Sequence, residues 1–77
     1  MDNALKQQIA EELEVTPEEL VSSTVLRDLE YWDSVTALTI MTLIDISVRT
    51  RISPDEFSEA QTFGDIETIV ANASGSA

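Results

Sequence analysis

The chain has 77 residues, with 15 Asp and Glu against 4 Lys and Arg, which gives a formal net charge of −11. This length suits a single domain, and the charge argues against nucleic acid and anionic lipid as partners. The absence of His and Cys removes the commonest general base, the commonest metal ligands and any disulfide. The acidic balance favours partners with basic patches, although such a surface can also serve solubility alone.

Residues 2–14 have the pattern of an amphipathic helix. Asp2 can cap its start. Apolar residues recur every four positions along one side, namely Leu5, Ile9 and Leu13. This spacing predicts a helix with one face in a core.

A second helix start follows at Thr16-Pro17-Glu18-Glu19, where Thr16 can act as cap and Glu19 as its capping-box partner. From Ser22 to Tyr31 the sequence predicts an ordered loop rather than a helix. Its apolar residues are spaced to reach a core, and they are Val25, Leu26 and Leu29. A long connection fixed in this way suggests that its end is being positioned.

The stretch after this loop predicts a long helix from about Ser34 to about Val48, capped by Asp33. On a helical wheel, one narrow stripe faces a core and consists of Ala37, Ile40, Met41, Ile44 and Val48. The opposite side carries Val35, Leu38 and Ile46, mixed with Thr39 and Thr42. A surface helix needs only the first stripe to fold, so the second must cover another part of the bundle or bind a partner.

Ser53-Pro54-Asp55-Glu56 predicts a short helix with Phe57 and Ala60, and Thr62-Phe63-Gly64-Asp65 predicts the start of the last helix. Residues 72–77 are expected to be a flexible tail. The fold class is therefore all-α, a small bundle of three longer helices plus one or two short ones, in a single domain over residues 1–77.

The order of these features resembles the acyl carrier protein family, whose motif is Asp-Ser-Leu at the start of the second helix. The resemblance begins with the loop and Trp32-Asp33-Ser34-Val35. It continues through the helix of about fifteen residues that follows, through Ile52–Glu56, and through Thr62–Asp65. It covers nearly the whole chain.

The resemblance implies that Ser34 carries a covalent 4′-phosphopantetheine arm, with Asp33 and Val35 as motif neighbours. A phosphopantetheinyl transferase would add the arm from coenzyme A. The arm's thiol would then hold acyl groups as thioesters for acyl-transfer, ligase or synthase enzymes with basic docking patches. No His or Lys lies near Ser34 in the sequence to activate it as a nucleophile, which suits a residue modified by another enzyme. The expected protein is a monomeric, non-catalytic carrier without a metal site. A cytoplasmic location is expected because no signal peptide and no apolar run of ~20 residues is present.

The family likeness also implies two sets of contact residues. The expected partner face is Val35, Leu38, Thr39, Thr42, Asp45 and Ile46. The candidates for lining an acyl pocket are Ala37, Ile40, Met41, Ile44, Val48, Ala60, Phe63 and Ile66. Housekeeping fatty-acid carriers usually have glutamates on the partner face. Their absence here favours a specialised fatty-acid, polyketide-type or lipid pathway.

Five other interpretations stay open at the level of the sequence. Asp33-Ser34 could be a helix cap and nothing more. The cargo could be an aminoacyl or peptidyl group, and the broad apolar surface of the long helix could simply pack between neighbours. From other classes, the chain could be an unmodified acidic adaptor for a basic helix, or an enzyme that works with carboxylates.

Overall fold

Polar side chains set where the four α-helices begin in the computed structural model, which describes residues 1–74. Asp2, Asp33, Ser53 and Thr62 each accept a hydrogen bond from a backbone amide of the first turn, at 2.8–3.4 Å. The helices that follow are α1 (Asn3–Leu13), α2 (Ser34–Val48), α3 (Pro54–Ser58) and α4 (Phe63–Ser74). These caps satisfy amide groups that have no partner inside the helix. The predicted all-α fold and its four α-helix starts are confirmed.

The second predicted start gives only one turn of 3₁₀ helix, η1 (Pro17–Glu19). The Thr16 amide donates to the Glu19 carboxylate at 2.7 Å, as the capping box predicts. Leu20 then leaves helical geometry, at φ −93° and ψ 89°, and its side chain is buried. Burial of Leu20 therefore ends the turn. The loop beyond contains a second 3₁₀ turn, η2 (Leu26–Asp28), which the sequence did not predict.

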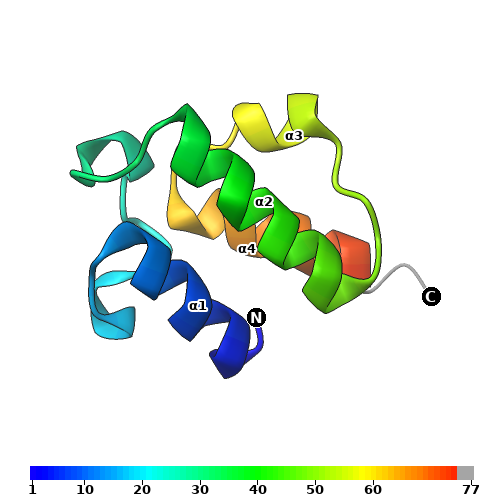
Figure 1. Ribbon diagram of the computed structural model, residues 1–77, viewed down its shortest axis with the longest axis horizontal. Helices are drawn as coiled ribbons and strands as arrows, with labels where there is room; N and C mark the ends of the chain where they lie inside the picture. Colours follow the sequence, from blue (N-terminus) through cyan, green and yellow to red (C-terminus); the bar gives the residue numbers. More distant parts are fainter. Residues whose placement is uncertain (75–77) are drawn as a thin grey trace.

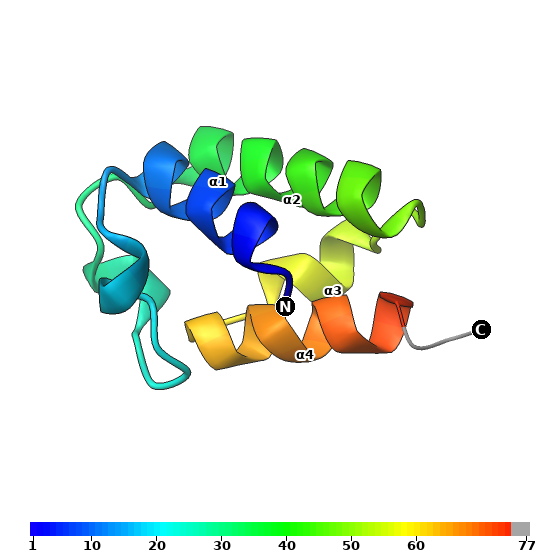
Figure 2. The same ribbon diagram turned by 90° about the horizontal axis from the view of Figure 1, so that it is seen from below.

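Three longer helices surround the core, and α2 is central among them. Figure 1 shows α2 crossing the middle of the molecule, with α1 on one side of it, α3 on the other, and α4 behind. Figure 2 shows α1 and α2 side by side in one layer and α4 in the opposite layer. Because α2 contacts both α1 and α4, its inner face is enclosed while its outer face is left to solvent.

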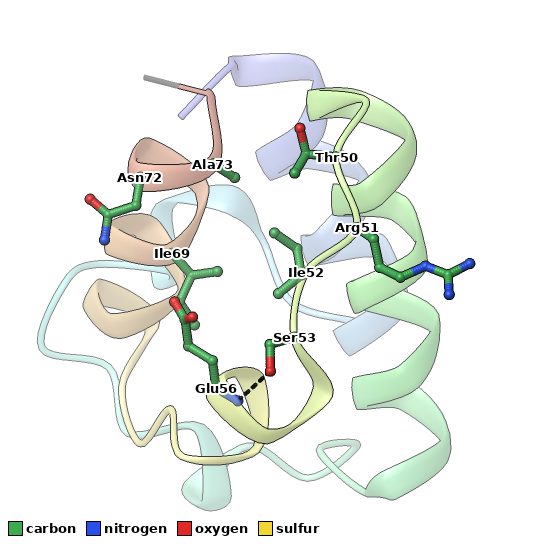
Figure 3. Close-up of a pocket in the computed structure, with 8 residues that line it drawn as sticks. All are labelled: Thr50, Arg51, Ile52, Ser53, Glu56, Ile69, Asn72 and Ala73. Carbon is green, nitrogen blue, oxygen red and sulfur yellow. Dashed lines mark hydrogen bonds between the residues drawn. The ribbon is translucent and has the colours of Figure 1, made fainter. Parts of the chain in front are cut away.

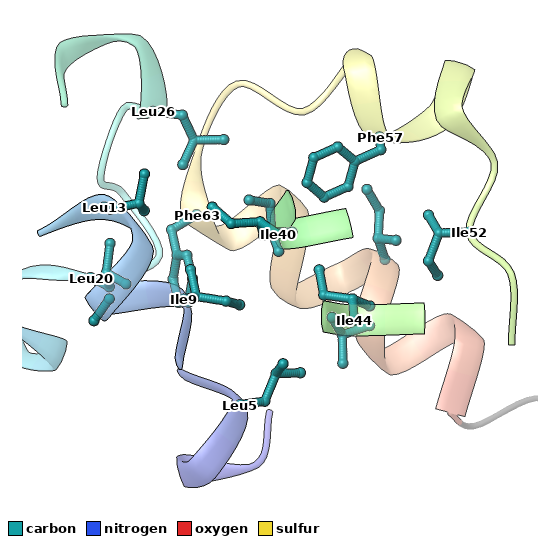
Figure 4. Packing of buried hydrophobic residues seen from close by; sticks show 14 residues of the cluster. Leu5, Ile9, Leu13, Leu20, Leu26, Ile40, Ile44, Ile52, Phe57 and Phe63 are labelled. Carbon is teal, nitrogen blue, oxygen red and sulfur yellow. The ribbon is translucent and has the colours of Figure 1, made fainter. Parts of the chain in front are cut away.

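The core contains the residues that the helical spacing selected (Figure 4). Leu5, Ile9 and Leu13 of α1 are buried, as are Ile40 and Ile44 of α2. α1 also contributes Ala10, and further members come from the loops and the last two helices, namely Leu20, Leu26, Ile52, Phe57, Phe63, Ile66, Ile69 and Val70. Half-buried side chains pack around this cluster, and Leu43, which the sequence did not assign to the core, is one of them.

The loop before α2 is fastened to the start of α4 by backbone hydrogen bonds. The Leu26 amide donates to Gln61 O, the Phe63 amide to Thr24 O and the Gly64 amide to Ser22 O, each at 2.9 Å. Gly64 is required by this close approach, because a Cβ there would lie 2.7 Å from Ser22 O. The loop that leads to α2 is therefore held at a fixed position, in line with the expectation from its apolar residues.

The last helix runs further than predicted. α4 continues to Ser74, so residues 72–74, which were expected to begin the tail, are helical. Ala73 packs against the core, which accounts for the extra turn. The remainder of the predicted tail, residues 75–77, lies outside the described residues.

Candidate functional site

Asp33 closes the N-terminal end of α2. Its backbone is extended, at φ −142° and ψ −179°, and its carboxylate accepts a hydrogen bond from the Thr36 amide at 2.8 Å. Hydrogen bonds from the Thr36 amide, from the Thr36 hydroxyl and from the Val35 amide lower the pKa of Asp33, and together they outweigh desolvation, which raises it. The sequence analysis did not single out Thr36, although its place three residues after a capping Asp is the usual signal for such a partner.

Ser34 is the first residue of α2, and its side chain is exposed. Since Asp33 supplies the cap, the Ser34 hydroxyl is not needed to close the helix. The unpaired amides and the positive end of the helix dipole at this position favour a bound phosphate group. The geometry therefore offers an accessible hydroxyl in surroundings that stabilise a phosphodiester.

The two aromatic residues before Asp33 have different roles. The Trp32 ring lies 6.2 Å from the Phe57 ring of α3, centroid to centroid, and Trp32 packs against the core. Tyr31 is 43% exposed. Trp32 therefore anchors the residues before Ser34 to α3.

The outer face of α2 is apolar and nearly uncharged. Val35, Leu38 and Ile46 are 73%, 59% and 70% exposed. The hydroxyls of Thr39 and Thr42 donate to carbonyls one turn earlier in α2, at 3.1 and 3.0 Å. These hydroxyls are occupied within the helix, so the threonines add methyl groups to the apolar face.

Asp45 differs from the other residues of the expected partner face. It is half-buried, and its carboxylate accepts a hydrogen bond from the Ile52 amide at 2.8 Å. This contact braces the connection between α2 and α3. The only acid within α2 therefore has a structural partner, and little negative charge remains on the outer face.

The acyl-pocket candidates divide into two groups. Ile40, Ile44, Phe63 and Ile66 have no exposed surface and pack together. The other four are half-buried around the same cluster, namely Ala37, Met41, Val48 and Ala60. An acyl chain could enter this core only if these side chains moved apart.

A separate hollow of about 280 Å³ lies near the far end of α2 (Figure 3). The connection between α2 and α3 and the later turns of α4 form its walls, through Thr50, Arg51, Ile52, Ser53, Glu56, Ile69, Asn72 and Ala73. None of the eight acyl-pocket candidates belongs to this lining. At a rise of ~1.5 Å per residue, the length of α2 places the hollow about 20 Å from Ser34.

Over residues 1–74, no three His, Cys, Asp or Glu side chains come together in a group that could hold a metal ion. In the same part of the chain, no helix combines the length and apolarity needed to cross a bilayer.

An exposed serine at the start of a capped central helix is compatible with the carrier family that the sequence resembles. Comparison with protein families shows the family. The family described as "Phosphopantetheine attachment site" matches residues 3–70, and the chain belongs to this family. Its domain is the site of covalent 4′-phosphopantetheine attachment and is not itself catalytic. A search of curated proteins found no match.

Proposed function

We propose that Ser34 is the attachment point of the 4′-phosphopantetheine arm and that the protein carries acyl groups on that arm as thioesters. The observation that carries this proposal is that two adjacent residues at the start of α2 have different roles. Asp33 caps the helix, which leaves Ser34 exposed and without a structural role at this end.

Residues of the chain itself would hold the arm's phosphate. The first amides of α2 lie beside Ser34, and the helix dipole favours negative charge there. With no His or Cys in the chain, an external phosphopantetheinyl transferase makes the phosphodiester. The protein supplies the hydroxyl, a rigid platform and a surface for the enzyme to bind.

The cargo we propose is an acyl group of a specialised fatty-acid, polyketide-type or lipid pathway. Two features support this choice. The outer face of α2 lacks the glutamates that are usual in housekeeping fatty-acid carriers. Asp45, the one acidic residue of α2, accepts a hydrogen bond from the Ile52 amide. The strong overall acidity favours an acyl cargo over an aminoacyl or peptidyl cargo.

The outer face of α2 is the proposed partner surface, with Val35, Leu38 and Ile46 as its apolar contacts. Partner enzymes would place an apolar patch against these side chains. Basic residues at the rim of that patch would face the acids that flank α2, among them Asp28, Glu30 and Glu59, which are exposed. Burial of apolar surface would then supply most of the affinity, and charge would mainly speed the encounter.

The test is incubation with a broad-specificity phosphopantetheinyl transferase and coenzyme A, followed by intact-mass measurement. The wild-type protein should gain the mass of one arm. Ser34→Ala should gain none, whereas Ser47→Ala, which removes an exposed serine elsewhere on α2, should load like the wild type.

Two results would contradict the proposal. An unchanged wild-type mass would favour the unmodified adaptor, and a loaded Ser34→Ala would place the arm elsewhere. A separate measurement, the intact mass of the protein purified from its native host, would identify the cargo. An aminoacyl or peptidyl mass there would overturn the acyl assignment alone.

A further inference from the structure

A small hollow lies beside the residues that lead to Ser34. Its volume is about 90 Å³, which leaves room for several water molecules or for one group of a few heavy atoms. It is lined by Leu26, Arg27, Trp32, Ala60 and Gln61. Two parts of the chain that are far apart in the sequence therefore meet there: the loop before α2, from η2 to Trp32, and the connection between α3 and α4.

The hollow is within reach of a group attached to Ser34. Trp32 stands two residues before Ser34, so their Cα atoms are at most ~7 Å apart. The walls are also well fixed. The Leu26 amide donates to Gln61 O at 2.9 Å, and the Trp32 ring packs near Phe57. The hollow is thus a preformed feature of the attachment end of the molecule.

The lining combines three kinds of group. Leu26, Ala60 and the Trp32 indole supply apolar surface. The Arg27 guanidinium supplies a positive charge in a chain with only four Lys and Arg, and Gln61 supplies a side-chain amide. Both Arg27 and Gln61 are exposed, and neither side chain has a hydrogen-bond partner within residues 1–74. Their donors are therefore available to a ligand.

The half of the arm nearest the serine has matching chemistry. It contains a phosphodiester, then a carbon bearing two methyl groups, then a hydroxyl and an amide. The guanidinium suits the phosphate or the carbonyl, the indole suits the two methyl groups, and the Gln61 amide suits the hydroxyl or the amide.

We infer that this hollow is a seat for the dimethyl group in the proximal half of the phosphopantetheine arm, which would lie against Trp32, with the neighbouring polar atoms of the arm at the rim near Arg27 and Gln61. This inference rests on the proposed attachment to Ser34. The hollow is too small for the whole arm, so the thiol end and its cargo remain outside. The seat would hold the arm over the α3 side of Ser34 until a partner enzyme draws it away.

Trp32 is the only tryptophan in the chain, so tryptophan fluorescence reports on the surroundings of this one side chain. The protein is compared before and after complete loading with the arm, with loading verified by intact mass. We expect blue-shifted emission and a loss of acrylamide quenching in the loaded protein, because the arm covers the indole. Nuclear Overhauser effects between the arm's methyl protons and the indole protons should accompany these changes.

Variants distinguish binding of the arm in this hollow from a general change in Trp32 fluorescence on loading. Gln61→Ala and Arg27→Ala alter exposed side chains and should reduce both fluorescence changes. Ala60→Leu fills the hollow and should abolish them. Arg51→Ala removes an exposed cation near the other end of α2 and should leave them as in the wild type.

The outcomes distinguish the two proposals. A fully loaded wild-type protein with unchanged emission, unchanged quenching and no such Overhauser effects would overturn the seat while leaving attachment intact. Full changes in loaded Ala60→Leu would also overturn it. If Ser34 gains no arm, the attachment proposal fails, and the seat fails with it.

Discussion

Replacing Gly64 by alanine tests how the loop before α2 is held in place. The new Cβ would lie 2.7 Å from Ser22 O and 3.2 Å from Ser22 Cβ. The closer atom belongs to the backbone, and the Gly64 amide donates to that same oxygen at 2.9 Å. Relief of the clash therefore requires the loop to move, with loss of this hydrogen bond.

The magnitude follows from two opposing effects. Overpacking of this kind costs about 1–3 kcal/mol, while alanine gains up to about 1 kcal/mol over glycine in a helix. At the middle of the overpacking range, the net loss in the free energy of unfolding is about 1 kcal/mol. For a domain of this size that loss lowers Tm by about 4–8 °C for each kcal/mol.

The assay is thermal and urea unfolding followed by circular dichroism. Asn72→Ala is the control, because Asn72 is an exposed residue two turns further along α4, and it should change stability by no more than about 0.5 kcal/mol. Equal or greater stability for Gly64→Ala would refute the reasoning. In that case the contact between Gly64 and Ser22 would not constrain the loop.

Three other predictions concern α1 and α2. Hydrogen bonds lower the pKa of Asp33, so its ionised form stabilises the folded state. This stabilisation is fully present above the ordinary pKa of 3.8 and is lost as the pH falls through the lower pKa of the folded state. Asp33→Ala should therefore reduce stability at pH 7 and flatten the dependence of Tm on pH below about 4. Glu14→Gly should raise the free energy of unfolding by about 0.5–1 kcal/mol in urea titrations, since Glu14 has φ 55° in a region where glycine is not strained; an unchanged midpoint would contradict this. Leu38→Ser should raise the KM of a partner enzyme for this carrier without lowering Tm. Val21→Ser changes another exposed apolar residue outside α2 and should leave KM unchanged. Equal effects of the two substitutions on KM would argue against the outer face of α2 as the partner surface.

Local rules in the sequence were sufficient for the helices and their starts. A cap needs only one side chain and an amide two or three residues later, so Asp2, Asp33, Ser53 and Thr62 could be assigned without tertiary information. The core stripe of α2 could be assigned in the same way, because helical spacing alone puts Ile40 and Ile44 on one face.

Local rules failed where a distant residue decided the outcome. The start at Thr16 was correct, yet burial of Leu20 stopped the helix after one turn. The end of α4 was placed too early, although Ala73 continues the helical spacing of Ile69 and Val70, and its contact with the core keeps the last turn helical. Leu43 was left out of the core because it lies outside the stripe that helical spacing selected on α2.

The sequence by itself determined the family likeness, the helical fold and the choice of Ser34, because each depends on residue types at short, fixed spacings. Only the tertiary structure decided which groups are available for binding. It assigned the Asp45 carboxylate to the Ile52 amide, left the outer face of α2 apolar, and brought Arg27, Trp32 and Gln61 around one hollow. The physical reason is that hydrogen-bond partners and exposure depend on segments that meet only when the chain folds.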